Sequence, residues 1–349
     1  MKINRLFVLA VSLMILLMAL IIPTKVQADS LPFSVQTVLP DEQRDTSESY
    51  FDVVVASGKT AALTVKLKNT TNKAVKVDVK INAAQTASSG IVDYNPAKVA
   101  ANLPYKLTDY LKGKTAVTIP ASGTYVYKAT LTMPQKTMNG LMVGGLIFSP
   151  ATDDSESTQK SGVSVTNKYN YVIAVIARDT DRTWSPSMTL GAATIKQTNY
   201  QNTVAVPITN TSGTFLNQLH VETTAVNQTT GKKYHRTASD MQMAPNSTFD
   251  YAVNLPKKAQ AGQYKVQTKA YFVKNASGKY QDASGTHYQY MKMSATTVTL
   301  TAKKAKAMTN KLKVTKVGTP WYVYAIIGAF VVLMLVIVGL VILLLRRKK

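Results

Sequence analysis

The sequence predicts an all-β protein made of two antiparallel β-sandwiches in tandem. Short stretches in which apolar and polar residues alternate are separated by turns rich in Asn, Gly and Pro. Several stretches of the first half of the chain recur in the second half. Cysteine is absent from the 349 residues, so each domain rests on its hydrophobic core alone, for which about 100–150 residues are enough.

The first pair of strands is predicted from the stretch AALTVKLKNTTNKAVKVDVKI (61–81). Apolar and polar residues alternate through both of its halves, which are separated by the polar turn 69–72. The stretch 203–226 repeats this arrangement around the turn 210–213. Alternation on both sides of a short polar turn predicts, in each case, a β-hairpin with one buried face.

A second pair of matching stretches sets the domain limits. IPASGTYVYKATLTMP (119–134) resembles MAPNSTFDYAVNLP (243–256), and a glycine follows six residues after each closing proline, at Gly140 and Gly262. A strand-like run begins after each of these glycines. Repeated short strands and turns of this kind are typical of immunoglobulin-like sandwiches, which we place at 29–180 and 183–302.

The strand-like run LMVGGLIF (141–148) contains Gly144 and Gly145. It lacks the lysine and hydroxyl of a phosphate-binding loop, and it ends at Pro150, too short for a membrane span. Glycine inside a strand usually marks a bulge or the close approach of another segment. We therefore expect a neighbouring strand or loop to pack against the backbone at these two residues.

The N-terminus has the order of a secretory signal peptide. Lys2 and Arg5 precede the apolar stretch 6–22, and the small-residue pattern Val-Gln-Ala ends at Ala28. We expect residues 1–28 to be removed by cleavage between Ala28 and Asp29. The apolar stretch is slightly long, so an uncleaved membrane anchor is the alternative.

The C-terminal part predicts one transmembrane helix over 321–345. This stretch is uncharged, follows a lysine-rich juxtamembrane linker (303–320), and precedes a basic cytoplasmic tail (346–349). The expected membrane-interface anchors are aromatic at one end and basic at the other: Trp321, Tyr322, Tyr324, Arg346 and Arg347. No LPxTG-like sorting signal precedes the helix. The chain is thus expected to be a single-pass type I protein of the cell membrane, with its bulk extracellular at the cell wall.

Composition favours some partners and excludes others. The formal net charge is +23, which for an exported protein favours anionic wall polymer and membrane lipid as partners. Nucleic acid is not expected, since the chain is exported and carries no recognition motif. The histidines His220, His235 and His287 are scattered, with no metal-binding spacing and no His-Glu pairing. No nucleophile motif is present, so we expect neither an enzyme nor a metal or cofactor site.

The first domain has a long segment, 83–114, that carries Tyr94, Tyr105 and Tyr110. Loops on rigid scaffolds often carry recognition, so these three tyrosines are the candidate binding residues. An irregular edge of the sandwich explains the segment equally well. A second long loop, 149–169, is polar and acidic in its middle.

The assembled motifs resemble the WxL-interacting protein family of Gram-positive bacterial surfaces. In the first domain the resemblance is carried by FSVQTVLPDEQ (33–43), YFDVVVASGKTAALTVKLKNTT (50–71), AAQTASSGIVDY (83–94) and MNGLMVGGLIF (138–148). In the second domain it is carried by NQLHVETTAV (217–226), MAPNSTFDYAV (243–253) and AGQYKV (261–266). Where the family usually has YFDL followed by a proline-glycine turn, this chain has Val53 and Ser57-Gly58.

The resemblance implies an adhesion protein of the cell surface. Its first domain is expected to engage WxL-domain proteins and peptidoglycan, and its second to engage host or extracellular-matrix proteins. No residue-level site follows from the resemblance. The alternative is a structural spacer, or an accessory extracellular module of a membrane complex, with no ligand of its own.

Overall fold

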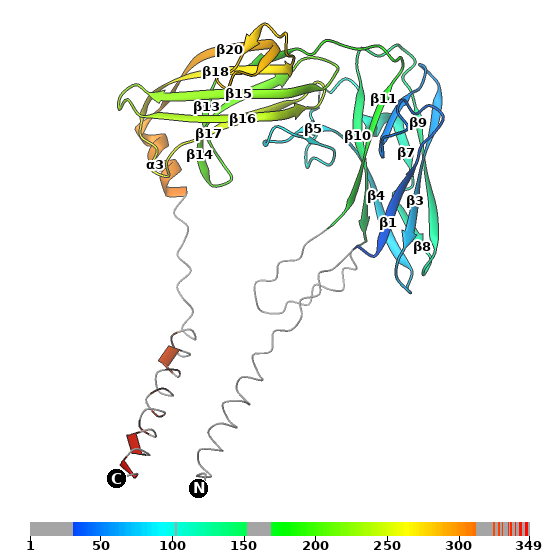
Figure 1. Cartoon of the computed structure of the whole chain (residues 1–349), viewed down its shortest axis with the longest axis horizontal. Coiled ribbons are helices and arrows are strands. Elements are labelled where there is room, and N and C mark those ends of the chain that lie inside the picture. Colours follow the sequence, from blue (N-terminus) through cyan, green and yellow to red (C-terminus); the bar gives the residue numbers. More distant parts are fainter. Residues whose placement is uncertain are drawn as a thin grey trace. The chain divides into compact units, whose positions relative to one another are not determined.

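The computed structural model describes residues 31–101, 103–151 and 169–311, together with single positions between 324 and 347 (Figure 1). The chain divides into two compact units. The described residues within Met1–Gln85 and Asp93–Trp184 form unit 1, and those within Thr86–Val92 and Ser185–Lys349 form unit 2. The division between the units falls after Trp184, and the short segment Thr86–Val92 is grouped with the second unit.

Unit 1 is a sandwich of two sheets. The first has the order β1-β3-β9-β7 and consists of β1 (Phe33–Val38), β3 (Thr60–Asn69), β9 (Thr124–Thr132) and β7 (Leu111–Gly113). The second has the order β2-β11-β10-β4-β8 and consists of β2 (Phe51–Val54), β11 (Tyr171–Arg178), β10 (Met142–Pro150), β4 (Val75–Ala83) and β8 (Ala116–Ile119). Neighbouring strands are antiparallel except β2 and β11, which are parallel.

Alternate residues of these strands form one apolar core. Along β3, Leu63, Val65 and Leu67 are fully buried, whereas Thr64 and Lys66 between them face outward. The segment between β4 and β7 contains the short strands β5 (Gln85–Thr86) and β6 (Val92–Asp93) and the helical turn α2 (Leu107–Tyr110), whose Leu107 reaches the core. The predicted buried face of 61–81 is therefore confirmed.

The predicted hairpins are wrong in one respect. β3 pairs with β1 and β9, whereas β4 pairs with β10 and β8, so the turn at 69–72 carries the chain from one sheet to the other. The turn at 210–213 does the same between β14 and β15. Alternation reveals which face of a strand is buried, but both layers of a sandwich bury one face and give the same pattern.

Unit 2 is a second sandwich. In its first sheet, β12 (Met188–Leu190), β13 (Thr194–Thr198) and β17 (Thr248–Asn254) all pair with β14 (Gln201–Asn210). Its second sheet has the order β16-β15-β18-β20-β19 and consists of β16 (Lys233–Met243), β15 (Leu216–Asn227), β18 (Gly262–Lys274), β20 (His287–Leu300) and β19 (Tyr280–Gln281). The prediction of two tandem antiparallel sandwiches is thus confirmed.

Helix α3 (Ala302–Lys311) packs onto unit 2. Its Ala305 and Met308 are buried in one of the two core clusters of the unit. Gln197 donates a hydrogen bond from Nε2 to the carbonyl oxygen of Met308, at 2.6 Å. The stretch 303–320 was predicted to be a linker, yet its first nine residues therefore belong to the folded domain, because two apolar residues at helical spacing cover the end of the core.

The predicted signal peptide and cleavage site, Ala28 and Asp29, lie outside the described residues. So do Trp321 and Tyr322, whereas Tyr324, Arg346 and Arg347 are described as exposed positions with helical or turn backbone. Among the residues that the structure describes, no helix has the length and apolar character needed to cross a membrane.

Candidate binding surfaces

Three neighbouring strands of unit 2, β15, β16 and β18, each contain one residue with an irregular backbone, and the pairing of β15 with β16 shifts register twice there. The regular pairing skips Gln218 in β15, Asp240 in β16 and Val273 in β18. Each of these residues has a positive φ, of 53°, 55° and 62° respectively. L-residues rarely adopt this backbone conformation, and a β-branched valine does so with strain.

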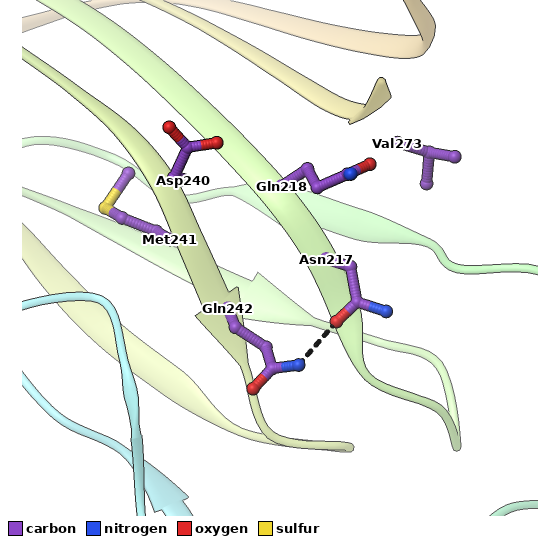
Figure 2. Close-up of a pocket in the computed structure, with 6 residues that line it drawn as sticks. All are labelled: Asn217, Gln218, Asp240, Met241, Gln242 and Val273. Atoms are coloured by element: carbon purple, nitrogen blue, oxygen red, sulfur yellow. Dashed lines mark hydrogen bonds between the residues drawn. The ribbon is translucent and has the colours of Figure 1, made fainter. Parts of the chain in front are cut away.

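These three irregular positions line a surface depression of about 570 Å³ (Figure 2). It is lined by six residues: Asn217, Gln218, Asp240, Met241, Gln242 and Val273. In Figure 2 the side chains of Asn217 and Gln242 point toward each other, and the Nε2 of Gln242 donates a hydrogen bond of 2.7 Å to the Oδ1 of Asn217. Irregular positions in strands, such as bulges, re-aim side chains and are frequent beside functional sites, so this depression is the candidate binding pocket of the second domain.

Lys274 holds these irregular positions in place. Its backbone N–H donates a hydrogen bond to the Oε1 of Gln218, at 2.8 Å, and its ammonium group lies 2.5 Å from the Oδ1 of Asp240. One residue of β18 is therefore bonded to the irregular positions of both β15 and β16. Strained conformations persist where the surroundings fix them in this way.

The pocket offers hydrogen bonds rather than reaction chemistry. Three side-chain amides line it, on Asn217, Gln218 and Gln242, and supply both donors and acceptors, while the carboxylate of Asp240 supplies acceptors. Such a lining suits the peptide groups or hydroxyls of a bound macromolecule. No periodic pattern in the sequence predicts this pocket, because its irregular positions interrupt the alternation on which the strand predictions rest.

The expectation that the histidines lack an acidic neighbour is wrong for His220. Its Nε2 lies 3.2 Å from the Oε1 of Glu222 and 3.9 Å from the Oδ2 of Asp282, and its Nδ1 lies 2.8 Å from the hydroxyl of Ser239. Residues two apart on a strand share one face, so the spacing of His220 and Glu222 was a usable signal.

Asp282, which approaches His220, also accepts hydrogen bonds from other residues of its own loop, between β19 and β20. Burial acts to raise the pKa of its carboxyl, but hydrogen bonds donated by Ser284 and Thr286 outweigh burial, and the pKa lies below its ordinary value. Within the described residues, no group of three or more His, Cys, Asp or Glu side chains is arranged to hold a metal ion. His220 is thus bonded into a structural network between β15 and this loop.

In unit 1, the three candidate tyrosines anchor the long segment 83–114. Tyr105 and Tyr110 pack against the core, and the hydroxyl of Tyr105 accepts a hydrogen bond from the backbone N–H of Asn139, at 3.1 Å. Tyr94 is half-buried, and burial raises the pKa of its hydroxyl. The role of these tyrosines in binding stays a prediction.

The expected close approach at Gly144 and Gly145 is confirmed. A Cβ atom on Gly144 would lie 2.1 Å from the carbonyl oxygen of Asn82 and 2.6 Å from a methyl carbon of Leu107. On Gly145 it would lie 2.7 Å from the carbonyl oxygen of Tyr94. Successive residues of a strand face opposite sides of the sheet, so Leu107 and Tyr94 approach β10 from opposite faces.

Comparison with solved structures finds several bacterial chaperones, each at low similarity. The class 5 fimbriae chaperone CfaA is 12% identical, and the match covers 76% of this chain and 100% of that one, at a TM-score of 0.32. The Pseudomonas aeruginosa CupB2 chaperone is 10% identical, with 71% and 96% covered and a TM-score of 0.28. The E. coli chaperone DraB is 11% identical, with 77% and 97% covered and a TM-score of 0.28. At these TM-scores, we base no argument on the similarity.

Comparison with curated proteins gives no match. Two family models, however, match successive parts of the chain. Residues 33–150 match the peptidoglycan binding domain of the WxL Interacting Protein family, and residues 160–316 match its host binding domain. The second match includes β11, which is a strand of the first sandwich. Since the two matches together cover most of the 349 residues, the chain belongs to the WxL-interacting protein family and is a surface binding protein.

Proposed function

We propose that this chain is a membrane-anchored, non-enzymatic binding protein of the bacterial cell surface. Its first domain engages WxL-domain proteins and cell-wall peptidoglycan, and its second engages an extracellular host or matrix protein. The observation that carries the proposal is that each of the two sandwiches matches a family model described by a binding function.

Two physical modes of attraction support different partners. The net charge of +23 attracts anionic wall polymer over a distance that shrinks from about 10 Å at 0.1 M salt to about 3 Å at 1 M. Strand edges, and the pocket at Asn217 and Gln242, offer short-range hydrogen bonds instead. Protein partners bound in this second way remain bound at high salt, whereas wall polymer is released.

The test measures both interactions with the same protein. The fragment 29–180 is expected to bind a WxL-domain protein with affinity largely retained at about 0.5 M salt, while its binding to isolated walls weakens steeply. If both interactions vanish together as salt is added, charge alone explains the association and the specific interface is refuted.

The second domain is tested through its pocket. Asn217→Ala combined with Gln242→Ala removes the amide pair at the rim and is expected to weaken capture of a host or matrix protein about tenfold, the effect of losing one or two hydrogen bonds. Gln289→Ala, at an exposed position of β20 outside the pocket, is the matched control. Equal affinity of both variants would show that the pocket is not the binding site, and failure of the unmodified chain to capture any such protein would favour the spacer alternative.

A further inference from the structure

One edge of the second sheet in unit 2 is left open. β20 pairs with β18 over nearly its whole length, from Tyr288 to Leu300. On its other side, β19 pairs only with His287 and Tyr288. Among the described residues, the stretch from Tyr290 to Leu300 has no strand beside it, so alternate backbone N–H and C=O groups point away from the sheet.

This edge lacks the usual protection against pairing. Proteins commonly protect open edges with charged residues, proline or bulges. Lys292 lies near the start of this stretch, but Met293–Leu300 (MSATTVTL) contains none of these features. At about 3.3 Å per residue, these eight residues form a regular edge of about 26 Å. The opposite edge of the same sheet, β16, carries Lys233, Arg236 and Asp240 and an irregularity in its pairing.

The core-facing side of this edge is incompletely covered. Ser294, Thr296 and Val298 alternate toward the interior and are all half-buried, and Val298 packs against the core cluster that includes Val266. The hydroxyl of Thr296 accepts a hydrogen bond of 3.3 Å from the N–H of Ala193, so the opposite sheet touches the edge here without pairing with its backbone. A further strand with apolar side chains on this face would bury the half-exposed Val298.

The solvent-facing side is basic. In the register between β18 and β20, Lys265 lies opposite Thr297 and Lys269 lies opposite Met293, whose side chain is 63% exposed. Between Ser185 and Leu300 the chain has eleven basic and four acidic side chains. An added strand would place its own solvent-facing side chains next to Met293 and Thr297, within reach of both lysines.

We infer that the β20 edge, Met293–Leu300, accepts an extended acidic segment of a partner protein as an additional strand. The segment has apolar, β-branched residues on its core-facing side and glutamate or aspartate on its solvent-facing side. The inference rests on the proposed binding role of the second domain, and it names the chemistry of the partner. A second copy of this chain fits less well, because antiparallel pairing of two β20 edges would bring two rows of lysines onto one face.

The probe is a labelled peptide of about nine residues in which valine and glutamate alternate, long enough to span the uncharged part of the edge. Binding to the purified full-length chain is measured by fluorescence anisotropy. The double variant Lys265→Glu and Lys269→Glu is expected to weaken binding about tenfold or more, since two cross-strand charge pairs become repulsive. Lys232→Glu combined with Lys233→Glu, beside the far edge, is the control with the same change of net charge and is expected to change affinity less than about twofold.

Backbone pairing is tested separately from charge. Two peptides are made, one methylated at the odd-numbered and one at the even-numbered amide nitrogens, so that each keeps its side chains but loses the N–H groups along one edge. The peptide that loses the N–H groups facing β20 is expected not to bind, whereas the other is expected to bind. If both methylated peptides bind as well as the parent, the peptide is held by charge alone and the inference is wrong.

The absence of cysteine gives a positional test. Thr297→Cys places a single thiol on the β20 edge, and Thr237→Cys places one on the exposed β16 edge. A peptide with one central cysteine is expected to form a disulfide with the first variant at least about tenfold faster than with the second. Equal rates, or a disulfide-linked dimer of the chain in place of the peptide adduct, would overturn the inference.

The outcome also separates this inference from the proposed function. Val298→Lys places an inward-pointing charge on the edge, which blocks strand addition. If this variant still binds the host or matrix protein that the unmodified chain binds, the proposed function stands and the edge is not its site. Circular dichroism and the melting temperature establish that the variant is folded, and loss of binding by a folded variant supports the edge.

Discussion

Asn69 and Asn210 occupy the same corner of the two sandwiches and make matching hydrogen bonds. The Nδ2 of Asn69 donates to the carbonyl oxygens of Lys73 and Pro120, and that of Asn210 donates to those of Thr214 and Ala244. The Oδ1 of each accepts from the backbone N–H and the hydroxyl of the residue two positions later, Thr71 or Ser212. Both asparagines are almost completely buried. The internal repeat therefore extends to individual side-chain contacts.

Replacing either asparagine is expected to destabilise its own domain. Asn69→Ala and Asn210→Ala each leave buried carbonyl groups without donors, at a cost of about 1–3 kcal/mol. Denaturant titration of each variant measures the decrease in the free energy of unfolding. Asn72→Ala, at an exposed position of the same turn, is the control, and an equal loss there would show that the buried network contributes nothing specific.

Gly145→Val is expected to destabilise the first sandwich by about 1–3 kcal/mol, as for an overpacked core. The added side chain would meet the backbone of Tyr94, which cannot move aside as the end of a flexible side chain can. Thr118→Val, at an exposed position of β8, is the control for valine in a strand. An unchanged melting temperature for Gly145→Val would show that the segment 83–114 yields without cost.

Two buried tyrosines predict a loss of stability in alkali. Burial raises the pKa of Tyr127, and likewise of Tyr251, to about 12, against about 10 in the unfolded chain. The folded state keeps these protons more tightly, so their contribution is fully present below pH 10 and is lost as the pH rises from about 10 towards 12.

Tyr127→Phe isolates this effect from the titration of the lysines. Below pH 10 the variant is expected to be less stable than the unmodified chain, because it lacks the hydrogen bond from the hydroxyl to the carbonyl oxygen of Lys114. Above pH 10 the difference is expected to narrow, as measured by the free energy of unfolding at a series of pH values. A difference that stays constant to pH 12 would contradict the raised pKa.

The two sandwiches are expected to fold separately. Fragments 29–180 and 183–302 should each give β-type circular dichroism and a cooperative melt, and the two-domain interpretation is wrong if neither does. Extending the second fragment to residue 311 should raise its melting temperature, because Ala305 and Met308 of α3 complete the core. Equal melting temperatures of 183–302 and 183–311 would show that α3 contributes nothing to this unit.

The membrane anchor remains a prediction from the apolar stretch 321–345. Truncation before Trp321 is expected to release the protein into the medium, which immunoblotting of culture fractions detects. Recovery of the intact protein only as wall-linked fragments after digestion of the wall would contradict a membrane anchor.

The sequence predicted the layers of the fold better than their connections. Burial of Leu63, Val65 and Leu67 follows from the period of two, and the close approach at Gly144 and Gly145 follows from the missing side chains. The crossing of β3 to β4 between sheets was missed, because the choice of neighbouring strand depends on contacts far apart in the chain.

The candidate pocket was missed for a related reason. The pocket is formed where three strands that are separated in sequence each have a positive φ, at Gln218, Asp240 and Val273. None of these residue types indicates a positive φ as strongly as glycine does. No local sequence pattern predicts that Thr86–Val92 is grouped with unit 2 either. Features that depend on one strand can therefore be predicted from the sequence, whereas features formed by several strands together cannot.

The position of β11 determines when the first sandwich can fold during synthesis of the chain. β11 lies between β2 and β10 and is parallel to β2, pairing Asp52 with Ile176. Synthesis proceeds from the N-terminus, so the first sandwich lacks an internal strand until Arg178 has emerged, and its nascent β10 has an unpaired, apolar edge until then. Contacts this far apart in sequence form slowly. A chain ending at Pro150 contains the whole first family match but is expected to aggregate rather than fold.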